Sequence, residues 1–510
     1  MAKLVTKGLK YSALTITASV IFSFTSTNLS SLYILGELGG SNTTASYTIS
    51  LFGIGNALTI PLGTNHGGKL GMKKMTWCCI FLFLLATFFL GLSPNYPIFC
   101  LFRFLQGLFS GPLFALVSSL LSPLSSTEQK QELTLNLTAI FITVSTLSAC
   151  LGGVIAYEYT WRWIFLIDWC VPFIASIFFY FSLKKEVFEI DQRPFDFIGY
   201  AAYFISILSI SLFFILGQEL DWLTSNLLVA CLILFIIFFP LFILQLTLHP
   251  NPILNFRLLI TKRMIVALIE LSILFGTYYA MMFMLSIWLH LYAAYTPTWI
   301  ALVLGCMLIS TAVVFYLVSF HHKRTSPLLL VTAITIILIA SVMTMQYNVD
   351  IDLFRLSVSR TITGIGLALF LPPLLFMILN CCENEPGIEA LALFHIFRTL
   401  GAGLGLSIIS TIWQRREVFY HLRLGGALTP TSQLVHQFYE RTREAFFTPA
   451  MSKDALSDAL EREAVSLALN DCFYLIAILM AFLLVLLFAL LISERKPKPH
   501  PVNIFPKKLS

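Results

Sequence analysis

Residues 97–121 read PIFCLFRFLQGLFSGPLFALVSSLL. Folded as a helix, a stretch of this length crosses the ~30 Å hydrocarbon core of a membrane, because each residue adds ~1.5 Å. Lipid cannot bond exposed backbone N–H and C=O groups, so the stretch must be a helix or a strand of a closed barrel. Its apolar residues are continuous and do not alternate, which indicates a membrane-spanning helix.

Fourteen runs of this kind follow one another along the chain. The first comes after three lysines, but it is too long for the apolar core of a secretory signal and no A-x-A-like site follows it, so we expect a retained span. The sequence therefore predicts an all-α polytopic membrane protein, with spans near residues 11–34, 45–64, 75–92, 97–121, 133–156, 161–182, 195–216, 224–247, 263–289, 297–320, 327–346, 354–379, 390–412 and 472–492.

The composition agrees with a membrane protein and excludes other classes. Of 510 residues, 58% are hydrophobic and 11% charged, whereas a soluble protein carries roughly a quarter charged residues. The net charge of +6 is small and scattered, so nucleic acid is not an expected partner. The ten cysteines form no CxxC pair, and the chain lacks HExxH and GxSxG motifs, so we expect no metal, cofactor or enzymatic activity.

Lysine and arginine are distributed unevenly between the predicted connections. If the N-terminus is cytoplasmic, the inner segments hold twenty of the 32 basic residues, and the short outer loops carry acids such as Glu37 and Asp350. Basic residues stay on the cytoplasmic side of membrane proteins. We therefore expect a multi-pass protein of the cytoplasmic (inner) membrane with both termini inside.

The chain contains an internal repeat. Arg103-Phe-Leu-Gln-Gly-Leu in the fourth span parallels Arg360-Thr-Ile-Thr-Gly-Ile in the twelfth, and Pro112 and Pro372 follow. Paired halves with a binding site between them near the midplane are a common transporter design. The predicted units are an N-terminal six-helix bundle (1–182), two inserted helices with linkers (183–262), a C-terminal six-helix bundle (263–492) and a basic cytoplasmic tail (493–510).

Residues 413–471, before the last span, break the compact pattern. They contain seven basic and eight acidic residues and include an amphipathic helical stretch, Gln433–Phe447. A long loop without a function is uncommon. The segment is interpreted either as a solvated extracytoplasmic loop or as a docking surface for a periplasmic adaptor or another envelope protein.

Ionisable residues at membrane depth are the candidate functional residues. Such groups cost roughly 2.5–3.5 kcal/mol on insertion scales and mark pathways or internal pairs. Arg103, Gln106 and Gly107 share one helix face because they lie at positions i, i+3 and i+4. The intramembrane ionisable residues are Arg103, Asp168, Glu270, Arg360, His395 and Arg398, with Arg162 and Arg355 near span ends.

Asp168 and Glu270 are the two carboxylates expected inside the membrane. Burial disfavours an ionised carboxylate and an adjacent arginine favours it, so each could carry protons or pair with a cation such as Arg162 or Arg103. Glu270 could also reach the interface near Arg263.

Glycines recur where helices would meet. Gly-x3-Gly and similar patterns allow close backbone approach, either for packing or for sliding. The predicted packing glycines are Gly107, Gly111, Gly152, Gly153, Gly401 and Gly405.

Five segments together resemble one known family. They are Ser50–Pro61 in the second span, Arg103–Pro112 in the fourth, Trp161–Asp168 in the sixth, Gly217–Trp222 between the inserted spans and Phe397–Gly401 in the thirteenth. Over residues 11 to 492 the chain resembles a major facilitator superfamily transporter of the fourteen-span EmrB/QacA drug:proton antiporter type.

The resemblance implies that two six-helix bundles rock to export amphipathic compounds against inward proton flow. Arg103 matches the family's fourth-span arginine, which is thought to take part in proton transfer. Lys69, Gly71, Lys73 and Lys74 match the cytoplasmic loop motif that latches the bundles.

The chain also departs from the family pattern. Thr25 and Asn28 stand in the first span, where relatives carry an aspartate, and Ser148 and Ala149 replace the Gly-Pro pair of the fifth-span motif. Asp168 and Glu270 are then the candidates for the missing carboxylate.

The sequence thus favours an alternating-access exporter of small amphipathic molecules, with an apolar cavity lined by Tyr278, Tyr279 and Phe283. The alternatives are a specialised exporter or facilitator of one metabolite, siderophore or anion with altered proton coupling, and a non-transporting scaffold or receptor on a carrier fold.

Overall fold

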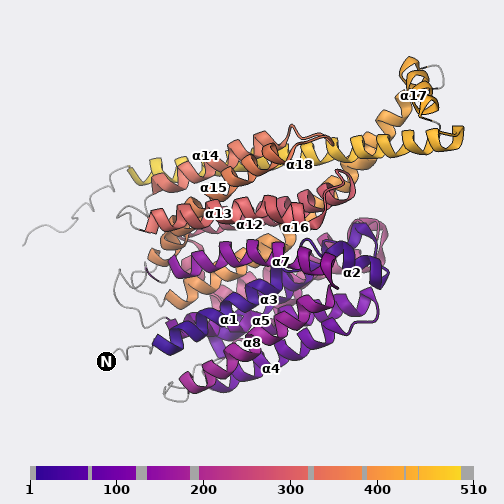
Figure 1. The fold of residues 1–510 in the computed structure, drawn as a ribbon. Coiled ribbons are helices and arrows are strands. Elements are labelled where there is room, and N and C mark those ends of the chain that lie inside the picture. Colours follow the sequence, from indigo (N-terminus) through magenta and orange to yellow (C-terminus); the bar gives the residue numbers. More distant parts are fainter. Residues whose placement is uncertain are drawn as a thin grey trace, which may run out of the picture.

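The computed structural model describes residues 7–66, 72–121, 132, 135–183, 195–319, 327–381, 387–429, 432–445 and 447–495. Every regular element among these residues is a helix. The helices lie along one common direction in two bundles, one from the first part of the sequence and one from the last, as Figure 1 shows.

The N-terminal bundle is built around α5, which packs against α3 and α4, while α8 packs against α1 and α4. Its helices are α1 (Lys7–Thr25), α2 (Ser31–Leu38), α3 (Tyr47–His66), α4 (Met72–Gly91), α5 (Tyr96–Leu121), α7 (Ser145–Glu158), preceded by the π-helical turn η2 (Ile140–Val144), and α8 (Arg162–Leu183).

The C-terminal bundle repeats this arrangement. α15 packs against α13 and α14, and α18 packs against α12 and α14. Its helices are α12 (Lys262–Leu291), α13 (Pro297–Ser319), α14 (Pro327–Thr344), α15 (Leu353–Asn380), α16 (Gly387–Ala427), α17 (Gln433–Glu444) and α18 (Pro449–Arg495).

Two equivalent glycines show how closely the halves correspond. A Cβ added to Gly107 on α5 would lie 2.3 Å from the carbonyl oxygen of Phe52 on α3. A Cβ added to Gly364 on α15 would lie 2.4 Å from the carbonyl oxygen of Met307 on α13. The motif repeated in the sequence therefore makes the same backbone contact with the second long helix of each bundle.

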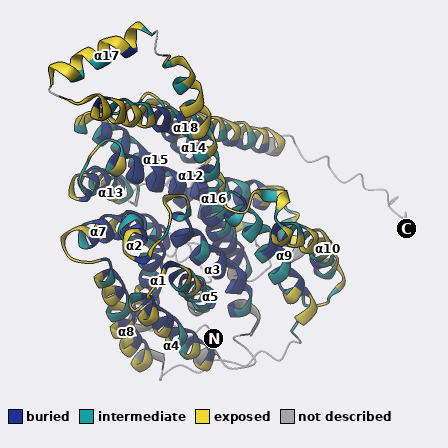
Figure 2. Ribbon diagram, turned by 90° about the vertical axis from the view of Figure 1, so that its right-hand side faces the viewer, coloured by how far each residue is buried: buried dark blue, intermediate teal, exposed yellow. Residues whose placement is uncertain are grey.

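Between the bundles in sequence lie α9 (Phe197–Leu216), η3 (Trp222–Thr224), α10 (Asn226–Leu248) and the short α11 (Phe256–Leu259). The pair α9 and α10 lies at the edge of the molecule (Figure 2). The Tyr203 hydroxyl of α9 donates to the Ala57 carbonyl of α3 at 2.9 Å, which attaches the pair to the N-terminal bundle. The most apolar stretch of α10 is only 17% buried, as expected for a helix that faces lipid.

Twelve of the described helices are long and apolar enough to cross a membrane. α1 counts only as a shorter apolar helix, and α3 is absent from the twelve. The exact number of fourteen spans therefore stays a prediction. The start of α1 and the end of α18 lie at the same end of the molecule (Figure 1), as an even number of crossings requires.

The prediction of one continuous first span over 11–34 is wrong. α1 ends at Thr25, residues 26–30 form turns, and α2 begins at Ser31. Serine and threonine side chains compete for backbone hydrogen bonds, and the sequence here is Ser-Thr-Asn-Leu-Ser. The Ser26 carbonyl packs directly on Gly152 of α7, where a Cβ would lie 1.9 Å from the oxygen. Only a glycine allows α7 to support this break.

Residues 413–471 are not the loop that one interpretation expected. α16 runs without interruption to Ala427, and α18 begins at Pro449. These helices have 41 and 47 residues, or ~60 and ~70 Å at ~1.5 Å per residue, and so extend well beyond a ~30 Å hydrocarbon core. Figure 1 shows their extensions projecting from the bundle, with α17 at the tip. The amphipathic helix predicted at Gln433–Phe447 is present as α17.

A Gly107→Ala substitution tests the close contact between α5 and α3. The added methyl group would overlap backbone atoms of Phe52, which cannot rotate away, so we expect a loss of stability on the order of 2 kcal/mol. The measurement is reversible unfolding of the purified protein in detergent. The matched control is Gly305→Ala on α13, where no atom lies within 4 Å of the added Cβ. Equal stability of the two variants would contradict the assigned contact.

Candidate functional site

Arg103 lies at the centre of the N-terminal bundle and is completely buried. Its Nε donates to the Thr48 carbonyl at 2.7 Å, and its Nη1 donates to the Ser23 carbonyl at 3.0 Å. Nη2 donates to the Thr27 hydroxyl at 2.8 Å. Ser23 belongs to the last turn of α1, whose carbonyls have no partner within the helix and carry partial negative charge. The guanidinium thus stabilises the helix end that the break creates.

Gln106 connects Arg103 with Asp168. Its Oε1 accepts from Arg103 Nη1 at 2.7 Å, and its Nε2 donates to Thr87 Oγ1 at 2.8 Å and to Asp168 Oδ2 at 3.1 Å. The other carboxylate oxygen of Asp168 accepts from the Ser23 hydroxyl at 2.5 Å. Asp168 and Arg103 therefore interact through intermediaries, without a direct ion pair. We call these residues, with Thr27 and Thr48, the Arg103 cluster.

The first-span positions Thr25 and Asn28 lie beside this cluster. The Thr25 hydroxyl donates to the Ile21 carbonyl at 3.0 Å and contacts the Ser148 hydroxyl of α7. Two positions where the chain departs from the family pattern are therefore in contact. The Asn28 side chain is buried, and its amide atoms have no hydrogen-bond partner in the described part of the chain.

Arg162 does not pair with Asp168, which was one of the predicted partnerships. Its Nη2 donates to Glu37 Oε1 at 2.8 Å, while Trp161 Nε1 donates to Glu37 Oε2 at 2.6 Å. Arg162 also lies over the Trp161 ring, 4.3 Å from its centre. Glu37, which was expected in an outer loop, lies near the end of α2 and joins this helix to the start of α8.

The ionisable candidates of the C-terminal bundle differ in their partners. Arg360 Nη2 donates to Thr344 Oγ1 at 2.6 Å, so its charge is partly satisfied within the bundle. Glu270 is completely buried in α12, which rules out the predicted reach to the interface near Arg263. Among described residues, neither of its carboxylate oxygens has a hydrogen-bond partner.

Arg398 occupies the contact between the bundles. It is 1% exposed, and its Nε and Nη2 atoms also lack hydrogen-bond acceptors among the described residues. Aromatic rings surround the guanidinium, with Phe141 of the N-terminal bundle centred 4.6 Å from its Cζ atom. His395, one turn earlier on α16, stacks on Phe114 with ring centres 4.8 Å apart.

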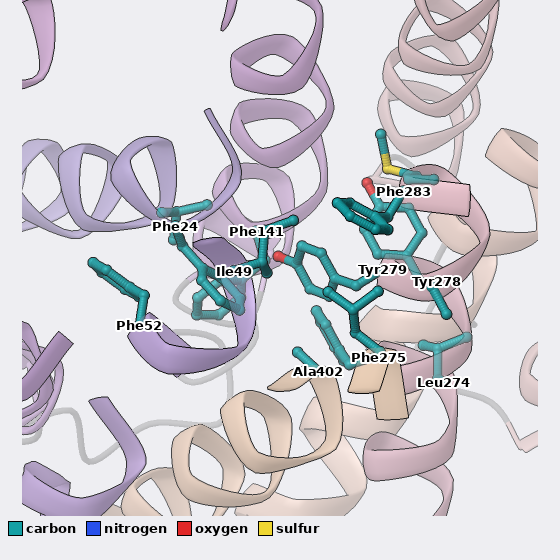
Figure 3. Close-up of a cluster of buried hydrophobic side chains, with 14 of the residues drawn as sticks. Phe24, Ile49, Phe52, Phe141, Leu274, Phe275, Tyr278, Tyr279, Phe283 and Ala402 are labelled. Carbon is teal, nitrogen blue, oxygen red and sulfur yellow. The ribbon is translucent and has the colours of Figure 1, made fainter. Parts of the chain in front are cut away.

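Aromatic side chains fill the centre of the interface between the bundles. Figure 3 shows Phe24, Phe52 and Phe141 facing Phe275 and Tyr279 across it. The ring centres of Phe24 and Tyr279 are 4.9 Å apart. These rings fill the middle of the interface between the bundles.

Of the three predicted cavity residues, Phe283 lines a pocket formed by described residues. Tyr278 is packed, and its hydroxyl lies 3.0 Å from Thr146 Oγ1 of α7. Phe283 lines a pocket of about 230 Å³ between the bundles, together with Ser46, Trp413, Glu417 and Glu461. Phe283, Trp413 and Glu417 place the pocket on the part of α12 and α16 that leads toward α17.

Small and hydroxylated residues form the contact between α3 and α16. The Ser50 hydroxyl donates to the Gly403 carbonyl at 3.0 Å, and the Ser407 hydroxyl donates to Ser50 Oγ at 2.9 Å. A Cβ added to Gly53 would lie 3.1 Å from the Thr399 carbonyl oxygen. The bundles thus meet through a few polar contacts between closely spaced backbones.

The remaining predicted glycines all lie at close helix contacts. A Cβ on Gly111, Gly153, Gly401 or Gly405 would come within 2.1 to 2.5 Å of an atom of another helix or of the segment after α1. Gly401 and Gly405 meet Ser272 and Gly276, which joins α16 to α12. These closest approaches therefore all lie within one half or the other, and the contact of Gly53 with Thr399 between the halves is longer.

The predicted latch motif is only partly described. Lys69 and Gly71 lie outside the described residues, Lys73 lies in the first turn of α4, and the Lys74 side chain is exposed.

Sequence reasoning found Gln106 but missed the hydroxyl members of the Arg103 cluster. Ser23, Thr48 and Thr87 come from three helices and Thr27 from the turns after α1, and none carries a charge that would single it out. The available signal was the unusual density of hydroxyl residues in the first span, from Ser19 to Ser31.

Related transport proteins match nearly the whole chain. It is 25% identical over 455 residues to a fatty acid resistance protein, FarB, of Neisseria gonorrhoeae, covering 89% of this chain and 90% of that one. It is 24% identical over 447 residues to the multidrug export protein EmrB of Escherichia coli K12, covering 87% of each.

Solved structures share the fold. A POT family transporter, PepTSo, matches with a TM-score of 0.58 at 14% identity, covering 94% of this chain and 98% of that one. The human organic anion transporter MFSD10 matches with a TM-score of 0.53 at 13% identity, covering 93% and 99%. The family model described as Major Facilitator Superfamily matches residues 12–406, and the two repeated bundles have the matching architecture. The chain belongs to the Major Facilitator Superfamily of membrane transporters.

Proposed function

We propose that this protein exports small amphipathic compounds by alternating access. The observation that carries the proposal is the interface between the repeated bundles, which is closed by a few aromatic rings and serine contacts near the middle of the molecule. The relatives named for multidrug export and fatty acid resistance support efflux as its direction. Transport requires this interface to open and close around the substrate.

Proton influx is the proposed energy source. A charge that crosses the membrane is worth ~2.3 kcal/mol per 100 mV, so one coupled proton supports about a fifty-fold gradient. Coupling needs a buried group that binds and releases a proton during the cycle. Glu270 fits this role because its carboxylate is buried and has no partner among described residues. Asp168 is the second candidate, because Gln106 connects its carboxylate to the Arg103 guanidinium by hydrogen bonds.

Substituting the two carboxylates tests the coupling. We expect Glu270→Gln to abolish pH-gradient-driven efflux, because the amide cannot exchange a proton, and Asp168→Asn to reduce it several-fold. The measurement is accumulation of a fluorescent amphipathic dye in cells with and without a protonophore. Asp352→Asn, at an exposed position next to Arg355, is the matched control. Full protonophore-sensitive efflux in the Glu270→Gln, Asp168→Asn double variant would refute both assignments.

A reversible disulfide tests the opening of the bundles. The Ser50 and Ser407 hydroxyl oxygens are 2.9 Å apart, so cysteines at both positions would be close enough to form a disulfide. We expect oxidation of the Ser50→Cys, Ser407→Cys protein to stop transport and reduction to restore it. Each single variant controls for the ten native cysteines. Unimpaired transport by the quantitatively oxidised double variant would show that α3 and α16 do not separate there.

The projecting ends of α16 and α18, with α17, are proposed to bind a periplasmic adaptor or another envelope protein, with both chain termini in the cytoplasm. The large apolar side chains of Leu422 and Leu434 are 70% and 74% exposed on this extension. Exposed apolar residues that gather on one projecting element mark interaction surfaces.

If the projecting helices bind a partner protein, substitutions on them should affect intact cells and isolated membrane vesicles differently. Leu422→Asp with Leu434→Asp should abolish resistance conferred on intact cells and leave dye transport by membrane vesicles unchanged. Arg441→Gln on α17 is the control. Equal losses in cells and vesicles would indicate a role in transport itself and contradict the docking role.

A second candidate function is transport of an anion by a specialised carrier. Arg398 is a buried cation at the bundle interface, and its Nε and Nη2 atoms have no acceptor among the described residues, which favours this function.

A further inference from the structure

Arg398 has an environment unlike that of the other buried arginines. Its Cζ atom lies 5.1 Å from the ring centre of Phe114, 4.6 Å from that of Phe141 and 5.6 Å from that of Phe275. Phe114 and Phe141 belong to the N-terminal bundle, and Phe275 belongs to the same bundle as Arg398. The guanidinium is therefore enclosed by rings from both moving halves. We call these three rings the aromatic cage.

The cage does not satisfy the hydrogen-bond donors of the guanidinium. Nε and Nη2 have no acceptor among the described residues, whereas Arg103 and Arg360 donate to carbonyl, amide or hydroxyl oxygens. Cation–π contacts compensate only part of the cost of burying a charge. A buried arginine whose Nε and Nη2 donors lack acceptors can bind an anion through these donors.

The free donors have a specific geometry. Nε–H and the adjacent N–H of Nη2 lie parallel on one edge of the planar guanidinium, spaced to match the two oxygens of a carboxylate. In Arg398 both atoms of this edge lack acceptors among described residues. A phosphate can use the same edge, so the shared chemistry is a single oxyanion.

We propose that the side-on edge of Arg398 binds the carboxylate head of an amphipathic anion, such as a fatty acid, as the transported substrate. This inference rests on the proposed export function and names its substrate class. The surrounding rings, including Phe24, Phe275 and Tyr279, form an apolar environment for an alkyl chain.

The origin of the cage suggests how the site is emptied and filled. When the bundles separate, Phe114 and Phe141 move away with the N-terminal bundle and expose the edge of Arg398 to substrate. When the bundles close without substrate, the rings again cover the guanidinium and replace the carboxylate. The cage thus keeps the cation buried in the empty transporter.

The test compares two ligands that differ only in the head group. Laurate and dodecanol have the same chain length, and binding is measured on the full-length protein in nanodiscs of phosphatidylcholine, which carries no net charge. We expect wild-type protein to prefer laurate, and Arg398→Gln to reduce this preference about tenfold or more through loss of the charged bidentate pair. Arg355→Gln, at an arginine whose side chain is 78% exposed, should keep the wild-type preference.

Arg398→Lys is a second variant that keeps the test decisive if Arg398→Gln does not fold. Lysine keeps the charge but lacks the paired donors, so an intermediate preference supports the site. An unchanged preference in Arg398→Gln, or equal losses of laurate and dodecanol binding in Arg398→Lys, would overturn it. If phosphatidylglycerol added to the nanodiscs abolishes the preference, the guanidinium binds a lipid phosphate and the substrate assignment is wrong.

Flux measurements separate this inference from the proposed function. Wild-type protein in vesicles that exports a dye but shows no laurate preference would refute only the carboxylate site. Protein that moves neither dye nor laurate would refute the proposed export.

Discussion

Polar groups at membrane depth must find partners inside the protein, and the Arg103 cluster meets this requirement for the N-terminal bundle. The first span breaks after Thr25 and leaves carbonyls of its last turn without helical partners. Arg103 donates to the carbonyls of Ser23 and Thr48. One buried cation therefore permits the break and fixes α1, α3 and α5 relative to one another.

The cluster also gives Asp168 its environment. Ser23 and Gln106 donate to its carboxylate, and Gln106 accepts from Arg103. A change in the charge of Asp168 would therefore alter the hydrogen bonds of Arg103, which stabilises the end of α1. Glu270 lacks such a network among described residues. The two carboxylates thus differ in their surroundings: Asp168 belongs to a hydrogen-bond network, and Glu270 is buried without a hydrogen-bond partner among the described residues.

The interface between the bundles combines two types of contact. Aromatic rings such as Phe24 and Tyr279 exclude water from the centre, while glycines and serines on α3 and α16 bring backbones together without long interdigitating side chains. Such a surface can separate with few broken hydrogen bonds. Arg398 is enclosed by rings from both bundles, so a separation of the bundles would uncover its guanidinium.

The amino-acid sequence alone predicts the helical membrane fold, the internal repeat and most helix positions, because long apolar runs that do not alternate cross lipid as helices and not as barrel strands. It also identified the buried ionisable residues, since charges stand out in apolar segments. Their partners are seen only in the folded protein: Arg162 pairs with Glu37 and not with Asp168, Arg103 donates to helix-end carbonyls, and Arg398 packs against aromatic rings. The sequence also did not predict how far α16 and α18 extend, because exposed helices outside the bilayer have no apolar pattern that marks their ends. Partners are set by contacts between segments far apart in the chain, and these contacts leave no local signal in the sequence.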